Sequence, residues 1–375
     1  MSLALSTLIY EWRRYLAAMV ALSCAGVLIL AESGFFFGII AAYTATIERS
    51  RAEVLVLPPN AQSLNNMGGV PRRVMPLVYM HPDVLEVRDR EGGNARFIAE
   101  GEAFPTWVNI NVVDTEPDAL TIPTDYSEHV RTALTVPFNV VIDRTAAKQL
   151  KVSSGDVASM NGRAVRIAAL LDGYPNMDSP VVVMSRQTNH LLNPGSGLAE
   201  RVGPLVVRLK EGVDPRQARD ELNAIADGQY RAWTRPELVQ ATVKNIMSNS
   251  LVALLMGFTV VIAILIGIAI TYMTLRGAIL ANVKEFASLR ALGVSMGSLR
   301  LVVMELSFWV GLAGLVMTAG LMVIVTWAAK LGGVPMAYQM NWVTFVAILL
   351  MIIAVLSGFF TLGVLKQSQP ADLLR

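Results

Sequence analysis

The sequence is poor in cysteine, histidine and charge. Of its 375 residues one is cysteine (Cys24), three are histidine and 16% are charged. A single cysteine excludes an internal disulfide and a cysteine-based metal cluster. His81, His129 and His190 are too widely spaced in the sequence for a zinc motif. Soluble proteins ordinarily have about a quarter charged residues, so this chain is too apolar for that class. Its net charge of +2 gives no indication of a nucleic-acid partner.

Motifs for catalysis or nucleotide binding are also missing. The chain has no GxxxxGK[ST] phosphate loop, and residues 45–245 have no nucleophile elbow and no metal-binding spacing. Asp114, Glu116 and Asp118 form an acidic cluster without the glycine and distal glutamate of a calcium loop, which favours a solvated turn. His81-Pro82-Asp83 indicates a turn and a helix start. We therefore expect that the chain is not an enzyme and binds no metal or cofactor.

Long apolar runs are what the sequence has in abundance. Four are long enough to cross a bilayer: Tyr15–Tyr43, Leu251–Leu275, Leu301–Ala329 and Trp342–Leu365. The first is about twice the length of a signal-peptide core, which favours an uncleaved span. Basic residues gather at one set of ends, namely Arg13, Arg14, Arg276, Lys284, Arg290, Arg300, Lys366 and Arg375, whereas the short loop 330–341 has only Lys330. This asymmetry predicts that both termini are cytoplasmic and residues 46–245 lie outside.

Residues 46–245 have the composition of a water-exposed domain. Short strand-like runs occur at Val54–Leu57, Arg96–Ala99, Val108–Val113, Val140–Asp143, Val165–Leu171, Val181–Met184 and Leu205–Leu209. Helices are predicted after Asp143 and after Asp214, where Asp214 is the N-cap and Pro215 the first helical residue. Ala218, Leu222 and Ile225 are the predicted buried face of the second helix. The predicted fold is four transmembrane helices with a large α+β domain inserted between the first and second.

Two acidic residues lie within the apolar runs. A carboxylate inside a span is costly, so Glu32 either faces protein or water, as part of a substrate path or subunit contact, or lies at the outer interface. Glu305 lies near the cytoplasmic end of the third span, and we expect it to pair with Arg300, Arg276 or Arg290 rather than to take part in transport.

Small residues recur in the third span. Gly311, Gly314 and Gly320 either allow close helix packing or are tolerated where the helix faces lipid.

The segment from Arg276 to Arg300 separates the second and third runs. Apolar residues recur at three- and four-residue steps, which places them on one helical face: Ile279, Val283, Phe286, Leu289 and Leu292. Gly293 is a helix stop, and Ser295 is positioned to cap the next helix. Periodicity alone leaves two interpretations open, an element that receives a partner and a loop that only joins two spans.

This segment resembles the signature of the FtsX/MacB superfamily of ABC-transporter permeases. The resemblance rests on Lys284-Glu285, on Leu289-Arg290-Ala291-Leu292-Gly293, on Leu299 and Glu305, and on the C-terminal stretch 369–375. The segment from Arg51 to Pro71, with Pro58-Pro59-Asn60 and Gly68-Gly69-Val70-Pro71-Arg72-Arg73, is most similar to the DevC branch.

The resemblance implies a division of the chain. Residues 1–45 hold the N-terminus and first span, and 46–245 form a periplasmic domain with a porter-like lobe and a small β-rich insert at about 138–204. The remaining parts are span two (246–275), a cytoplasmic coupling loop (276–300), span three (301–329), an outer loop (330–341), span four (342–366) and a cytoplasmic tail (367–375).

The resemblance also implies partners and a function. A separate ABC ATPase subunit would bind ATP and Mg²⁺, and two permease copies would pair with two ATPase copies in the bacterial inner membrane. A membrane-fusion adaptor and an outer-membrane channel would complete the assembly, and the cargo would be a lipid, glycolipid or other amphipathic molecule. Two other functions stay open: a lipoprotein-releasing or cell-wall-hydrolase-regulating transducer, and a membrane-anchored receptor without an ATPase.

Overall fold

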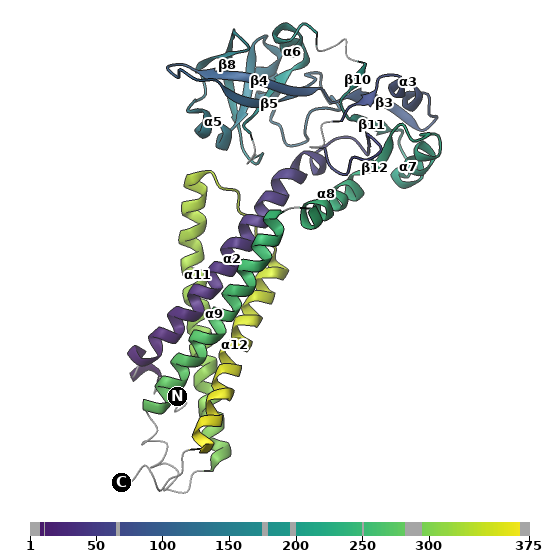
Figure 1. Cartoon of the computed structure of the whole chain (residues 1–375). Helices are drawn as coiled ribbons and strands as arrows, with labels where there is room; N and C mark the ends of the chain where they lie inside the picture. Colours follow the sequence, from purple (N-terminus) through teal and green to yellow (C-terminus); the bar gives the residue numbers. More distant parts are fainter. Residues whose placement is uncertain are drawn as a thin grey trace. The chain divides into compact units, whose positions relative to one another are not determined.

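The computed structural model describes residues 8–10, 12–64, 68–174, 179–195, 200–249, 251–281 and 295–367. The chain divides into two compact units. A helical unit comprises Met1–Gly38, Leu251–Gly332 and Met336–Arg375, and a mixed α/β unit comprises Ile39–Ser250 and Gly333–Pro335 (Figure 1). The large insertion between the first and second long helices is therefore a separately packed body.

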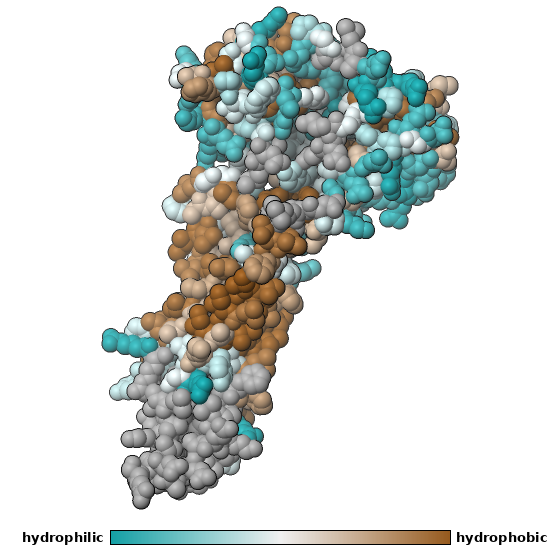
Figure 2. All heavy atoms as spheres, viewed as in Figure 1, coloured by the Kyte–Doolittle hydropathy of each residue, from teal (hydrophilic) through white to brown (hydrophobic). Residues whose placement is uncertain are grey.

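The helical unit contains four helices that are long and apolar enough to cross a membrane. They are α2 (Trp12–Glu48), α9 (Leu251–Ala281), α11 (Met296–Gly332) and α12 (Met340–Gln367). Their apolar stretches are Tyr15–Glu48, Leu254–Thr274, Arg300–Gly332 and Met340–Phe359, which confirms the four predicted spans. Figure 2 shows hydrophobic side chains over much of this unit's visible surface, as expected of helices that face lipid.

Close helix contacts hold the helical unit together. Leu22 and Ile29 of α2 are buried against Val346 and Leu350 of α12. A Cβ atom at Gly314 of α11 would lie 2.8 Å from Leu22 Cδ2. In lipid, where helices gain little from the hydrophobic effect, such small residues allow backbones to approach and gain packing contacts.

The mixed α/β unit begins with a four-stranded antiparallel sheet. Its strands are β1 (Val54–Leu57), β3 (Val84–Asp89), β11 (Leu205–Leu209) and β12 (Arg231–Thr234), in the order β12-β1-β11-β3. A short ribbon pairs β2 (Val70–Pro71) with β10 (Arg201–Val202), and the helices are α3 (Val74–Tyr79), α7 (Pro215–Ala224) and α8 (Arg235–Asn249). Strands β1 and β11 occupy the residues predicted for them, because β1 is a continuous apolar run and β11 is apolar except for Arg208.

Helix α7 begins as its sequence predicts. Asp214 is the N-cap and accepts a 3.0 Å hydrogen bond from the backbone N–H of Arg216, and Pro215 is the first helical residue. Ala218 and Leu222 are fully buried in the sheet lobe. The prediction for Ile225 was wrong, because the helix ends at Ala224 and Ile225 is 55% exposed.

The second part of this unit is a closed barrel. Its strands are β4 (Gly92–Ala99), β5 (Thr106–Val113), β6 (Asn139–Asp143), β7 (Val157–Met160), β8 (Arg163–Leu171) and β9 (Val181–Ser185), closed in the order β4-β5-β9-β6-β8-β7. Helices α4 (Glu128–Thr135), α5 (Arg144–Leu150) and α6 (Arg186–Leu192) accompany it. Buried side chains from all six strands form its core.

The β-rich part differs from the insert expected at about 138–204. It starts at Gly92, because β4 pairs with β7 and β5 pairs with β9, so two strands assigned to the porter-like lobe complete the barrel instead. The barrel is a mixed sheet, since β5–β9 and β6–β8 are parallel pairs and its other pairs are antiparallel.

Candidate functional site

The predicted coupling segment is described only at its two ends. Helix α9 continues to Ala281 and includes Ile279, and α11 starts at Met296. Ser295 Oγ accepts a 3.2 Å hydrogen bond from the backbone N–H of Ser298, so it caps α11 as expected. The other predicted coupling residues lie outside the described residues: Val283, Lys284, Glu285, Phe286, Leu289, Arg290, Leu292 and Gly293.

Glu32 lies within α2 and contacts the next helix of the unit. Its Oε2 accepts a 2.7 Å hydrogen bond from Thr259 Oγ1 of α9. Thr259 Oγ1 also lies 3.1 and 3.0 Å from the backbone carbonyls of Leu255 and Met256. The carboxylate therefore faces protein, which is where a polar group inside a span is least costly.

The expected ion pair of Glu305 is not formed with either arginine that the structure describes. Within the described part of the chain, neither Arg276 nor Arg300 forms a salt bridge with Glu305. Arg300 lies five residues before Glu305 on the same helix, and five steps of about 100° point the two side chains to different sides. The third expected partner, Arg290, lies outside the described residues.

The acidic cluster predicted as a solvated turn is partly buried. Asp114 is only 7% exposed, and its Oδ1 accepts a 2.7 Å hydrogen bond from Arg186 Nε. Arg186 also pairs with Asp89 at 3.1 Å and with Glu91 at 2.5 Å. Burial tends to raise the pKa of Asp114, but the hydrogen bonds and charge of Arg186, with Thr121, outweigh it and lower that pKa. The group joins the sheet lobe to the barrel electrostatically.

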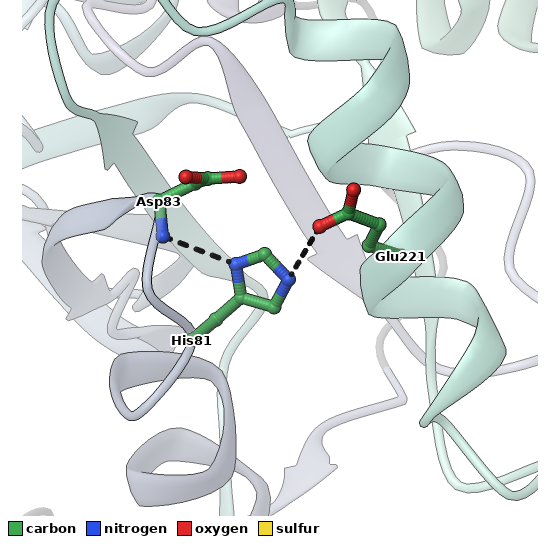
Figure 3. A group of neighbouring side chains, drawn as sticks. All are labelled: His81, Asp83 and Glu221. Atoms are coloured by element: carbon green, nitrogen blue, oxygen red, sulfur yellow. Dashed lines mark hydrogen bonds and ion pairs between the residues drawn. The ribbon is translucent and has the colours of Figure 1, made fainter.

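Figure 3 shows a second polar group, formed by His81, Asp83 and Glu221. One ligand atom from each lies within 4.8 Å of the others, a spacing that a metal ion could bridge. No zinc spacing is visible in the sequence, because Glu221 comes from α7, far along the chain from His81. His81-Pro82-Asp83 follows α3 and precedes β3, so the predicted helix start there was wrong.

The hydrogen bonds of His81 favour a structural role. Its Nδ1 accepts a 3.3 Å hydrogen bond from the backbone N–H of Asp83, which leaves the proton of the neutral ring on Nε2. Nε2 lies 3.3 Å from Glu221 Oε2 and is placed to donate to it. A metal bound at Nε2 needs the lone pair there and a proton on Nδ1, the reverse of this arrangement.

A cavity of about 750 Å³ lies in the mixed α/β unit. Arg90 and Glu91, between β3 and β4, line it, and so do Asn111 of β5 and Tyr126 and Tyr174 from loops. The two tyrosine rings meet edge to face at 5.5 Å. Arg90 is half-buried, and the desolvation of its guanidinium lowers its pKa.

Comparison with protein families gives two matches, which follow one another along the chain. The MacB-like periplasmic core domain matches residues 16–225, more than half of the chain, and the FtsX-like permease C-terminal domain matches residues 257–370. The chain belongs to the FtsX/MacB superfamily of permeases. The two matches occur in the same order as the parts of the structure. The mixed α/β unit of the permease lies in sequence between its first and second long helices. Members of this family are permease subunits of ABC transporters and are not themselves catalytic.

Solved structures similar to the permease are parts of other proteins. The periplasmic region of MacB from Actinobacillus actinomycetemcomitans is 12% identical, with a TM-score of 0.34, over 53% of this chain and 96% of that one. The extracellular domain of the ABC-type transporter YknZ from Gram-positive bacteria is 12% identical, with a TM-score of 0.30, over 49% and 99%. A domain of a Porphyromonas gingivalis permease protein is 16% identical, with a TM-score of 0.32, over 50% and 89%. The curated proteins compared give no match.

Sequence reasoning missed two features of the permease. Thr259 gave no signal, because a threonine in an apolar run commonly bonds to its own helix. Arg90 and Glu91 precede Gly92 and Gly93, the first residues of β4, and match no binding motif in the sequence. Only the fold brings Arg90 into one cavity with Tyr126 and Tyr174.

Proposed function

We propose that this permease couples ATP hydrolysis by a separate ATPase subunit to export or periplasmic transfer of a lipid, glycolipid or other amphipathic substrate. The observation that carries the proposal is the order of elements: a MacB-like periplasmic core domain followed by an FtsX-like permease C-terminal domain, in a chain with four candidate spans. The sequence holds no GxxxxGK[ST] loop, so ATP and Mg²⁺ bind the partner ATPase.

The proposed mechanism is mechanical transmission. ATP binding closes the ATPase dimer and displaces the segment between α9 and α11, and the spans carry that movement to the periplasmic domain. The proposed contact surface on the ATPase is the apolar face that contains Phe286, Leu289 and Leu292, with Lys284, Glu285 and Arg290 beside it. Gly293 ends this coupling helix, and the Ser295 cap starts α11.

The proposed assembly is a bacterial inner-membrane complex with both termini in the cytoplasm. Arg13, Arg276 and Arg300 lie at the helix ends assigned to the cytoplasm, and Lys330 lies at the end of α11 assigned to the outer side. Two copies of the permease pair with two ATPase copies. The DevC-like N-terminal segment supports a membrane-fusion adaptor and an outer-membrane channel as further partners.

The experiment introduces one charge at two positions of the coupling segment. Leu292→Asp puts a carboxylate on the proposed apolar contact face, whereas Ser288→Asp puts the same charge beside it. We expect Leu292→Asp, and likewise Gly293→Trp, to abolish stimulation of the ATPase while the protein still inserts. Ser288→Asp retains stimulation. Normal stimulation and transfer in both Leu292→Asp and Gly293→Trp would refute the coupling assignment.

Purification of the permease from its native membrane tests the partners. An ATPase together with a fusion adaptor supports the tripartite exporter, and an enriched lipid identifies a candidate cargo. An ATPase with a hydrolase or lipoprotein, and without an adaptor, would instead support a mechanical transducer. Recovery of no ATPase under conditions that preserve ABC complexes would contradict the proposal and favour a receptor.

A further inference from the structure

The cavity in the mixed α/β unit is built around a cation. Arg90 lines it, and the side chain is held by Asn111 Oδ1, which accepts hydrogen bonds from Nε at 3.3 Å and from Nη2 at 3.1 Å. The backbone N–H of Arg90 donates to the carbonyl of Pro204 at 2.9 Å. These contacts fix the guanidinium in position without neutralising it.

Arg90 differs from Arg186, another half-buried arginine of this unit. Arg186 is surrounded by three carboxylates, from Asp89, Glu91 and Asp114. Across the residues that the structure describes, no carboxylate pairs with Arg90. A charge removed from water without a counter-ion is costly, so a site that keeps one gains most from an anion supplied by a ligand.

The two carboxylates that also line the cavity are engaged elsewhere. Glu91 bonds to Arg186 and accepts a 2.9 Å hydrogen bond from Asn189 Nδ2. Asp143 Oδ1 caps α5 by accepting from Thr145, and its Oδ2 accepts a 3.0 Å hydrogen bond from the backbone N–H of Tyr174. The oxygens of both carboxylates therefore already accept hydrogen bonds from residues other than Arg90.

Apolar side chains form part of the cavity wall, which Arg201, Asn109 and Ser179 also line. Ile110, Leu171, Val181 and Val202 line it together with the ring of Tyr126. A Cβ atom at Gly203 would lie 1.8 Å from the carbonyl oxygen of Arg90, so only glycine allows the loop before β11 to pack against this wall. A volume of about 750 Å³ is of the size that holds a drug-sized ligand.

We propose that this cavity binds an anionic amphiphile, with its phosphate or carboxylate group on Arg90 and Asn111 and its apolar part against Ile110, Val181 and Tyr126. The interpretation of this cavity as the place where substrate is held outside the membrane rests on the proposed function. Binding itself needs no ATPase and can be measured on the permease alone.

The test uses purified full-length permease in a neutral detergent and three probes: inorganic phosphate, hexyl phosphate and hexanol. Titration calorimetry should give hexyl phosphate the tightest binding, because it alone combines charge with an apolar chain. Arg90→Gln should weaken hexyl phosphate binding by about tenfold or more, the loss expected for charge-assisted hydrogen bonds. Arg90→Lys keeps the charge and should recover part of the affinity.

Controls separate binding from folding and from coupling. Arg163→Gln removes an exposed arginine of the barrel outside the cavity and should leave the affinity within about twofold. Hexyl phosphate should raise the melting temperature of the natural protein but not of Arg90→Gln, a difference that a purely structural Arg90 would not produce.

Three results would overturn the proposal. The first is that the natural protein does not bind hexyl phosphate, and the second is that Arg90→Gln binds it as tightly as the natural protein does. The third is that inorganic phosphate and hexyl phosphate bind with equal affinity, which would indicate a site for a small free anion. Leu292→Asp should bind hexyl phosphate normally. Failure of ATPase coupling and failure of this site are therefore distinguishable.

Discussion

Glu32 Oε2 accepts a hydrogen bond from Thr259 Oγ1 across 2.7 Å, and this bond joins the first and second long helices of the permease. The two residues are 227 positions apart in sequence. Of the two interpretations of Glu32, the contact favours a carboxylate that faces protein over one that only marks the outer interface. The bond restrains α2 against α9, the two helices whose outer ends connect to the mixed α/β unit.

Thr259→Val tests this restraint. Valine keeps the shape of threonine but removes the donor, so Glu32 is left without the hydroxyl partner. We expect the free energy of unfolding to fall by about 1 kcal/mol, the range of hydrogen bonds between helices in membranes. Thermal unfolding of the detergent-solubilised protein measures it.

Thr274→Val is the matched control, because Thr274 lies on the same helix and donates to the carbonyl of Ile270 in its own helix. It should change stability by less than Thr259→Val does. Glu32→Gln keeps an acceptor for Thr259 and should preserve stability, so a loss of transport in that variant would reveal a role for the charge. Equal stability of Thr259→Val and the natural protein would mean that the bond contributes nothing measurable.

Three glycines of α11 give a graded test of helix packing. A Cβ atom at Gly311 would lie 2.9 Å from Ala354 Cβ, and one at Gly314 would lie 2.8 Å from Leu22 Cδ2. Gly311→Ala and Gly314→Ala should each lower stability by about 1–3 kcal/mol through overpacking. Around Gly320 the described residues leave open space within 4 Å, so its predicted packing role is not supported within one chain.

Gly320→Ala is therefore the control and should be neutral, or stabilising by up to about 1 kcal/mol from higher helix propensity. Melting temperatures of the three variants give the order. A loss in Gly320→Ala as large as in Gly311→Ala would show that Gly320 packs against another copy or partner.

The stability of the mixed α/β unit depends on pH through Asp114. Its folded pKa lies below the ordinary value of 3.8, so its contribution is complete above about pH 4 and is lost as the pH falls through the folded pKa. Asp114→Asn keeps an acceptor for Arg186 but removes the charge, and should cost about 2 kcal/mol near pH 7.

The difference between the natural protein and Asp114→Asn should shrink below about pH 4, which urea unfolding at several pH values can measure. Glu116→Gln, an exposed neighbour, should change stability by less than about 0.5 kcal/mol. A difference that stayed constant down to pH 2 would contradict the assigned charge pairing.

The sequence predicted the local features of this fold better than its long-range contacts. The caps Asp214 and Ser295 were predictable because a cap depends on residues two or three positions away. Strand β3 was missed because only Val84 and Val87 of its six residues are buried, which hides the alternation of a strand. The start of the barrel at Gly92 was missed because it depends on the pairing of β4 with β7, about sixty residues further on.

The candidate sites were less predictable for the same reason. The partners Thr259 of Glu32 and Glu221 of His81 are distant in sequence, so only the folded chain identifies them. Ile225 follows the apolar periodicity of α7, but the helix ends one residue earlier, and periodicity does not fix that boundary.

His81 gives the last prediction, which decides between a metal site and a structural contact. Because Nδ1 accepts from Asp83 and Nε2 faces Glu221, we expect the ring to act as a hydrogen-bonded link between α7 and the turn before β3. Addition of 100 µM Zn²⁺ to the full-length protein, which is about 100-fold above a micromolar dissociation constant, would stabilise a true site by about 2.7 kcal/mol. We expect no such rise in melting temperature. We also expect Glu221→Gln to keep most of the stability of the natural protein, because the glutamine oxygen can still accept a hydrogen bond from Nε2. A rise with Zn²⁺ that is lost in both His81→Gln and Glu221→Gln would show that the ring changes its tautomer and that these three residues bind a metal.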